Sequence, residues 1–325
     1  MALAVVAWLV SPAIQAQADT SPLVLESRIP LANVKGRIDH LAIDLQQNRL
    51  FVAELGNNTV DAIDLATGKV VHRIDGLAEP QGLGFLPKQK LLVIANGGDG
   101  SVWFVRTTDW SVAAKIDLGD DADNVRIDAT TGRVIVGYGE GALGLIDPAS
   151  LSKVGDVKFR GHPEGFRLDP VAGRAFVNIP DARRVAVIDL KSLKIVTAWQ
   201  MTDYAGHFPM ALDRPGGALA VVFRNPPMLI LVDSRSGAIR ASAATCGDSD
   251  DVFFDDKRQQ IYVSCGAGSV DVKQQGAAGL RDRGTVPTAK GARTSLFVPE
   301  LDRLFVAARA VGDADAAILV FRPVR

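Results

Sequence analysis

The chain has 325 residues, of which 47% are apolar and 22% are charged, and its formal net charge is −1. A near-neutral charge offers no electrostatic footprint for nucleic acid or for an anionic membrane, so neither is expected as a partner. The length would permit two domains, but no Pro- or Ser-rich linker interrupts the chain. We therefore expect one domain over residues 19–325.

The first 18 residues have the features of a secretory signal peptide. An apolar stretch, Ala2–Val10, is followed by a break at Ser11-Pro12 and by an Ala16-Gln17-Ala18 cleavage pattern. The apolar stretch is too short to span a bilayer, which requires about 20 residues. We expect residues 1–18 to be a signal peptide, the mature protein to be periplasmic or secreted, and no membrane span to be present.

From about residue 23 the chain repeats itself with steps of 41 to 44 residues. Each copy begins with an apolar strand that ends near an aspartate, as in HLAID at 40–44 and NVRID at 124–128, and continues with further short strands. A four-stranded repeat of this length is typical of a β-propeller blade, because one such sheet needs neighbours on both faces. The seven anchor positions are Asp44, Leu86, Asp128, Asp169, Asp213, Asp255 and Pro299. The aspartates among them are predicted to cap turns.

The two ends of the chain are predicted to share one blade. The last copy, which ends at 320–325, has only three strands, whereas LVLESRIPL at 23–31 aligns with the fourth strands of the other copies. Pairing these segments would leave the ring without a free edge. The sequence therefore predicts an all-β fold, a seven-bladed β-propeller with four antiparallel strands per blade, in which the N-terminal strand closes the last blade.

A strand such as RLFVA, a turn with Gly or Asn, and then VxVIDLxTGKVV recur along the chain, most clearly as LATGKVVHRI at 65–74 and as GRAFVNIPDARRVAVIDLKSLKIV at 173–196. This pattern resembles the bacterial YVTN-type seven-bladed β-propeller family over roughly residues 23–325. Blade six departs from it after Val272, where QQGAAGLRDRGTV replaces a short hairpin. The resemblance implies an architecture and hardly any chemistry, because its motifs are strand and turn residues.

The two cysteines are predicted to lie on adjacent blades at the top face, the face on which loops enter the first strands. Cys246 ends the fourth strand of blade five, and Cys265 ends the second strand of blade six. In an oxidising compartment we expect a disulfide, which would stabilise the fold by about 3 kcal/mol. The alternative is two buried cysteines that do not meet. The sequence has no CxxC or CxxCH, which argues against thioredoxin-like chemistry and c-type haem attachment.

Function in a propeller usually lies at the mouth of the central channel, which the top-face loops line. When the copies are aligned on their anchors, four of the seven blades carry an acid five residues before the anchor, and three of the four histidines fall in the same loops. The residues expected to bind a ligand at this mouth are Asp39, His40, Gln81, Asp123, Asn124, His162, Glu164, His207, Asp250, Asp251 and Arg293.

Converging carboxylates leave several functions open, because they can hold a hard cation, act as acid and base, or simply fill a wet funnel. The favoured interpretation is a monomeric binding module for an unknown small molecule or protein at the top face. The alternative is a metal-assisted hydrolase, such as a lactonase, with a divalent cation as candidate cofactor. A third hypothesis, an organic redox cofactor, lacks a visible attachment residue. The expected hydrolase core is Asp39, His40, Asp123, Glu164 and Asp250.

Two histidines in adjacent entry loops suggest one further site. His162 and His207 precede blades four and five, so they could meet Glu164 and Tyr204 and bind a transition metal. The alternative is that both imidazoles are hydrogen-bonded within the funnel wall.

Overall fold

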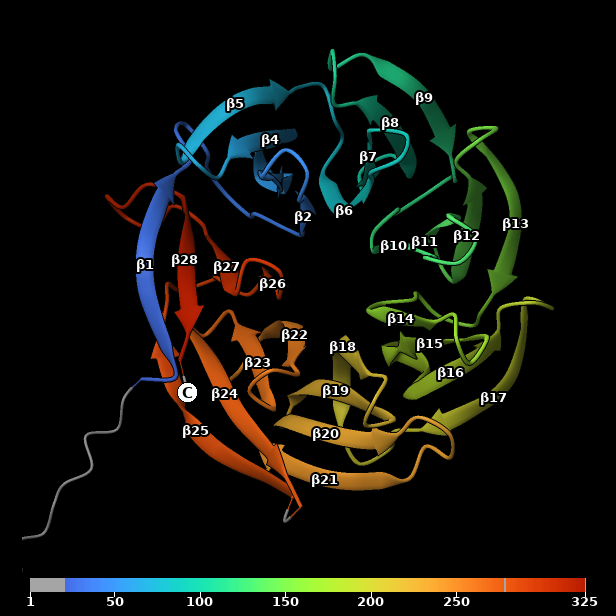
Figure 1. Ribbon diagram of the computed structural model, residues 1–325. Coiled ribbons are helices and arrows are strands. Elements are labelled where there is room, and N and C mark those ends of the chain that lie inside the picture. The colour runs from blue at the N-terminus through green and yellow to red at the C-terminus, as the bar shows by residue number, and fades with distance from the viewer. Residues whose placement is uncertain (1–20, 278, 325) are drawn as a thin grey trace, which may run out of the picture.

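The structure, a computed structural model, describes residues 21–277 and 279–324. It is a ring of seven four-stranded antiparallel sheets around a central axis (Figure 1). Each sheet is one blade, and its first strand lies nearest the axis while its fourth lies at the rim. The seven-bladed β-propeller predicted from the repeat is confirmed.

Six blades consist of four strands that are consecutive in the chain. Blade one contains β2 (Leu41–Asp44), β3 (Arg49–Glu54), β4 (Thr59–Asp64) and β5 (Lys69–Ile74). Blade two contains β6 (Pro80–Leu86), β7 (Leu91–Asn96), β8 (Ser101–Arg106) and β9 (Val112–Asp117). Blade three contains β10 (Val125–Ile127), β11 (Val134–Tyr138), β12 (Ala142–Asp147) and β13 (Ser152–Lys158). Blade four contains β14 (Phe166–Asp169), β15 (Arg174–Ile179), β16 (Arg184–Asp189) and β17 (Lys194–Gln200). Blade five contains β18 (Ala205–Asp213), β19 (Ala218–Asn225), β20 (Pro227–Asp233) and β21 (Ile239–Ala244). Blade six contains β22 (Ser249–Asp255), β23 (Gln260–Cys265), β24 (Ser269–Gly276) and β25 (Gly279–Pro287). Two short 3₁₀ helices, η1 (Leu55–Asn57) and η2 (Pro180–Ala182), follow second strands.

Blade seven joins the two ends of the described chain. It contains β26 (Ser295–Val298), β27 (Arg303–Ala308) and β28 (Ala317–Pro323), and its fourth strand is β1 (Leu23–Pro30). β1 runs antiparallel to β28 from the pair Leu23↔Pro323 to the pair Pro30↔Ala317. The predicted closure by the N-terminal strand is confirmed, and β28 has a partner on each side.

The apolar cores lie between neighbouring blades. The second and third strands are covered on both faces, so β7 is buried at all six positions, whereas the outermost strand of the same blade, β9, is buried at none. Between blades one and two, Phe51 packs in one cluster with Leu83, Leu92 and Val105. Burial on both faces explains why the inner strands are continuous apolar runs and the rim strands are mixed.

The pairing of the rim strand contains a register shift in each of the seven blades. Such bulges add a residue to one strand and increase the local twist. The first strands end at the bottom face, opposite the entry loops, and there the anchor aspartates cap turns as expected. Asp44 Oδ1 accepts the backbone N–H of Gln46 at 3.0 Å, and Asp213 Oδ1 accepts that of Gly216 at 2.8 Å.

Candidate functional site

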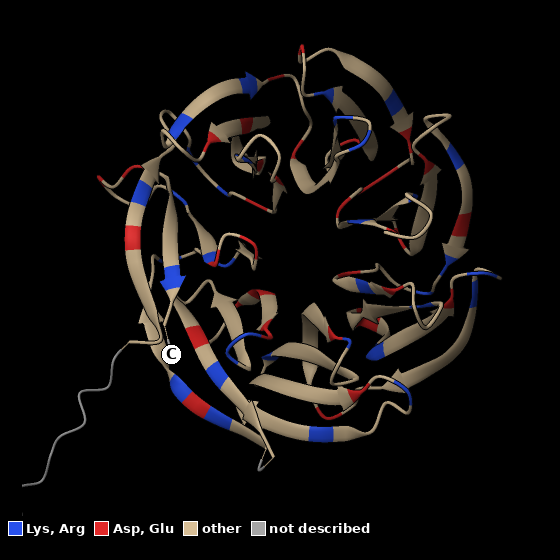
Figure 2. Cartoon of the chain, in the orientation of Figure 1, with Lys and Arg blue, Asp and Glu red and all other residues tan. Residues whose placement is uncertain are grey.

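A polar pocket of about 30 Å³ lies where the entry segments of blades one, three, four, five and six converge. A cavity of this volume has room for about two water molecules. Figure 2 shows acidic and basic segments together on the loops around the centre of the ring. The structure places seven of the predicted residues in the pocket wall: Asp39, His40, Asp123, Asn124, Glu164, Asp250 and Asp251.

Three other predicted residues belong to neighbouring polar contacts rather than to the pocket wall. Gln81 donates from Nε2 to Asp121 Oδ1 at 3.2 Å. His162 donates from Nδ1 to the carbonyl oxygen of Gly139 at 2.7 Å, and the same nitrogen lies 3.5 Å from Asp121 Oδ2. Arg293 contacts Asp250, one of the acids in the pocket wall.

His207 departs from its expected position at the mouth. Its side chain is fully buried, its Nε2 lies 3.0 Å from the carbonyl oxygen of Arg184, and its ring centroid is 5.2 Å from that of Phe223. Burial lowers the pKa of His207. The ring is therefore part of a blade interface and carries no charge at neutral pH.

These contacts disfavour the paired-histidine metal site and fit the alternative, in which both imidazoles are hydrogen-bonded. The imidazole of His162 is held by Gly139 and Asp121 of blade three, whereas that of His207 is held by Arg184 of blade four. Within residues 21–277 and 279–324, no group of three or more His, Cys, Asp or Glu residues has a geometry that could hold a metal ion. The donors that are present therefore do not fit either the transition-metal site or the divalent-cation site considered from the sequence.

His40 links the acids of blades one and six. Its Nδ1 lies 3.6 Å from Asp251 Oδ2, and its Nε2 lies 3.8 Å from Asp39 Oδ1. Burial opposes protonation, but the charges of Asp251 and Asp39 outweigh it and raise the pKa of His40 to about 10. Arg37 also contacts Asp39, at 2.6 Å, and the backbone N–H of Ser295 donates to Asp251 at 2.8 Å. Both carboxylates thus have cationic partners at neutral pH.

Asp250 is paired with two arginines. Arg224 Nη2 lies 2.6 Å from Asp250 Oδ1, and Arg293 Nε lies 2.9 Å from Asp250 Oδ2. The Arg224 guanidinium also stacks 3.9 Å from the ring centroid of Phe208. Burial raises the pKa of Asp250 to about 6, although both arginines oppose this shift. Asp250 therefore belongs to a fixed ion-pair network.

Asp123 and Glu164 differ from the other pocket acids, because neither forms an ion pair with any residue in the described part of the chain. Among the described residues, the only hydrogen bond to the Asp123 carboxylate comes from Asn124 Nδ2, at 3.1 Å. Burial, followed by the charges of Asp123 and Asp250, raises the pKa of Glu164 to about 8. Burial also raises the pKa of Asp123, although His40 opposes it. The charges of His40 and Arg224 act on these two acids without forming an ion pair, so an incoming cation could contact both carboxyl groups directly.

Sequence reasoning missed two arginines in the same channel. Arg126 and Arg167 lie in the wall of the pocket, on the innermost strands of blades three and four. Each stands two residues before its anchor aspartate. The signal was present in the repeat, because the equivalent residues of the other five blades are uncharged: Ala42, Gly84, Ala211, Phe253 and, by strand pairing, Leu296.

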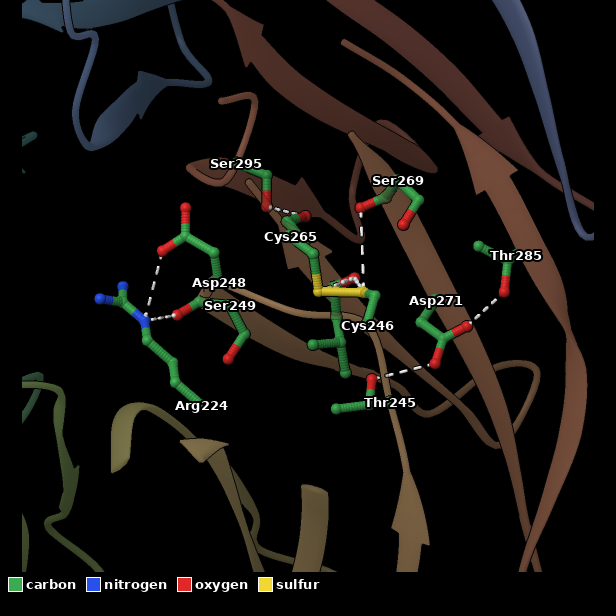
Figure 3. The surroundings of a disulfide bond; sticks show 12 residues. Arg224, Thr245, Cys246, Asp248, Ser249, Cys265, Ser269, Asp271, Thr285 and Ser295 are labelled. Carbon is green, nitrogen blue, oxygen red and sulfur yellow. Dashed lines mark hydrogen bonds and ion pairs between the residues drawn. A yellow bond between two sulfur atoms is a disulfide. The ribbon is translucent and has the colours of Figure 1, made fainter. Parts of the chain in front are cut away.

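A disulfide between Cys246 and Cys265 fixes the loop that carries the blade-six acids (Figure 3). Their Cα atoms are 5.9 Å apart across a sequence separation of 19 residues. Cys246 follows β21, and Cys265 ends β23, so the bond connects adjacent blades as predicted. Beside it, Asp271 accepts hydrogen bonds from Thr245 at 3.0 Å and from Thr285 at 2.6 Å. A disulfide fits an extracellular or periplasmic protein.

Among the described residues, no helix is both long and apolar enough to cross a membrane. No protein-family model matches the chain, and no curated protein matches it. A solved structure of hydrazine synthase from Kuenenia stuttgartiensis contains a chain with a TM-score of 0.78 and 16% identity, covering 90% of this chain and 97% of that one. A chain of a mitotic checkpoint complex has a TM-score of 0.77 and 13% identity, covering 100% of this chain and 98% of that one. At these identities the likeness shows the fold alone. A β-propeller can serve as a binding module or as an enzyme scaffold.

Proposed function

We propose that this protein is an exported, monomeric binding module of the YVTN-type propeller family, and that it holds a cationic group of a small molecule or protein segment at the top-face mouth of its channel. The internal repeat supports the family, and the disulfide supports an oxidising compartment. Residues 1–18, which lie outside the described residues, would be the signal peptide, and residues 19–325 the single propeller domain.

The observation that carries this proposal is the contrast between paired and unpaired acids in one pocket. Asp39, Asp250 and Asp251 already have cationic partners, whereas Asp123 and Glu164 do not. A ligand ammonium or guanidinium near Glu164 would supply the missing positive charge and form charge-assisted hydrogen bonds. The pocket is small, so it would take the charged group while the rest of the ligand lies against the top-face loops.

The same contrast disfavours the hydrolase hypothesis. Two members of its expected core, Asp39 and Asp250, are engaged by arginines and are not free to bind a metal or to move a proton. The donor geometry of the described residues offers no metal site. Binding needs only the two unpaired carboxylates.

A ligand screen tests the proposal. Primary amines, guanidines and quaternary ammonium compounds would be compared with neutral and anionic metabolites by thermal shift, and hits would be titrated by calorimetry. We expect cationic hits whose affinity falls about tenfold or more in Glu164→Gln, because a neutral amide cannot offset the ligand charge. Binding should also release protons near pH 7, because a cation lowers the raised pKa of Glu164.

Glu300→Gln is the matched control, since it makes the same chemical change at an exposed position outside the pocket. It should bind as the wild type does. Hits that are only neutral or anionic, or equal affinities for wild type and Glu164→Gln, would contradict the proposal.

A further inference from the structure

Arg126 and Arg167 face a second, larger space farther along the channel. A cavity of about 410 Å³ is lined by both arginines and mainly by apolar residues of the innermost strands, among them Leu83 and Phe253. The paired residues His40 and Asp251 also border it. Arg167 also borders a cavity of about 350 Å³. That cavity extends to the turns that follow the first strands at the bottom face, where its lining includes Arg214, Pro215 and Pro299. Arg167 can therefore be reached from the side opposite the acidic mouth.

The two guanidinium groups lie side by side, because both donate to the same acceptor. Arg126 Nε lies 3.2 Å from the carbonyl oxygen of Phe166, and Arg167 Nη1 lies 3.0 Å from it. Burial and the neighbouring charge of Arg126 hold the pKa of Arg167 well below its usual value, although the charge of Asp251 opposes this shift. Two like charges have thus been brought together in a region of low polarity, which is costly unless an anion offsets them.

Neither arginine forms an ion pair with any residue in the described ranges. Arg126 has two further hydrogen bonds, at 2.7 Å to the carbonyl oxygen of Val125 and at 3.1 Å to Asn124 Oδ1, and both acceptors are neutral. Within the part of the chain that the structure describes, the Arg167 side chain makes only its hydrogen bond to the carbonyl oxygen of Phe166. Since a guanidinium offers five N–H groups, Arg126 retains two after three bonds, and Arg167 retains four after one.

We propose that Arg126 and Arg167 form a binding site for a small oxyanion, a carboxylate or a phosphate, that enters the channel from the bottom face. Paired N–H donors on planar guanidinium groups match the oxygens of both anions. The apolar wall strengthens this attraction and accommodates an uncharged part of the ligand. Because both arginines also border the acidic pocket at the mouth, the anion would lie on their other side, in the larger cavity.

The test is calorimetric titration of the mature wild-type protein with inorganic phosphate and, separately, with succinate, at an ionic strength matched with sodium chloride. We expect saturable binding of at least one probe, and the probe that binds more tightly identifies the anion class. At about 100 times the Kd, the bound probe should raise the Tm by about 5 °C. Neither titration contains a cationic ligand, so the result does not depend on the function proposed for the mouth.

Arg167→Gln should weaken the tighter probe at least tenfold, and without anion it should melt no lower than the wild type, because the repulsion is relieved. Arg283→Gln makes the same change at an exposed position on β25 and should bind as the wild type does. If Arg167→Gln does not fold, Arg167→Lys, which keeps the charge but loses the planar fork, should still weaken binding. Absence of binding by both probes to the wild type, or unchanged affinity in the Arg167 variants, would overturn the proposal.

Discussion

The interfaces between blades and the wall of the central channel are built from the same strands. Among the seven copies of the repeat, however, the interface residues are uniform and the channel residues vary. At one position of the second strand, the fourth residue in six blades and the third in blade three, every blade has a fully buried β-branched residue: Val52, Ile94, Val136, Val177, Val221, Val263 and Val306. At the channel position two residues before the anchor, by contrast, side chains range from none at Gly84 to the guanidinium of Arg126. The interface positions are uniform because the packing between blades is the same around the ring. The channel positions do not have to meet this packing requirement, so we infer function from the residues found there.

Removing the closing strand should have the largest effect, because it breaks the regular interfaces. Deletion of residues 23–30 removes the buried side chains of Leu23 and Ile29 and leaves β28 as a free edge. We expect a loss on the order of 5 kcal/mol in the free energy of unfolding, together with aggregation. Urea denaturation measures the loss. Removal of residues 1–18 alone is the control, and equal stability of the two truncations would contradict the closure.

The disulfide reinforces one interface, that between blades five and six, and its loss should have the next largest effect. Exported protein should show no free thiol under denaturing conditions. Reduction, or the double change Cys246→Ser with Cys265→Ser, should lower the free energy of unfolding by about 3 kcal/mol. Two titratable thiols in the exported protein would be incompatible with the bond.

Within the channel, paired and unpaired acids should respond oppositely to neutralisation. Asp250→Asn leaves Arg224 and Arg293 with only the more exposed Asp248 as a shared partner and should cost about 1–2 kcal/mol. Asp123→Asn removes a buried charge that has no cationic partner, so stability should be unchanged or rise by about 0.5 kcal/mol. Chemical denaturation at pH 7 compares the two variants. Losses of similar size would show that Asp123 is also part of an ion-pair network.

The sequence predicted those features that depend only on repeat register. Closure by the N-terminal strand and the Cys246–Cys265 bond followed from counting strands along each copy. The repeat register predicts the blade on which a residue lies and its position along the strand. It does not predict the direction of the side chain where the strand pairing is irregular. His207 illustrates this limit, because the pairing of β18 with β19 shifts between His207 and Met210, and the imidazole faces a blade interface instead of the channel.

The arginines were missed for a different reason. Candidate residues were sought in the loops, where propellers usually bind ligands, whereas Arg126 and Arg167 lie within strands β10 and β14. Their lack of an ion pair could not be predicted either, because it depends on distances between blades. The same applies to Asp123 and Glu164, whose unpaired state distinguishes them from acids at equivalent positions.

Titration of Glu164 tests the central claim, that the mouth holds carboxylates without a counter-charge. Carbon-13 NMR of protein labelled at glutamate side chains, compared with Glu164→Gln for assignment, would give the pKa directly. We predict a value of about 8, against an ordinary value near 4.5. Because the folded-state pKa is raised, the associated stability is present below about pH 4.5 and is lost as the pH rises through about 8, a decline that Glu164→Gln should reduce. A Glu164 resonance that titrates near 4.5 would mean that the carboxylate is hydrated or already paired, and would contradict the account.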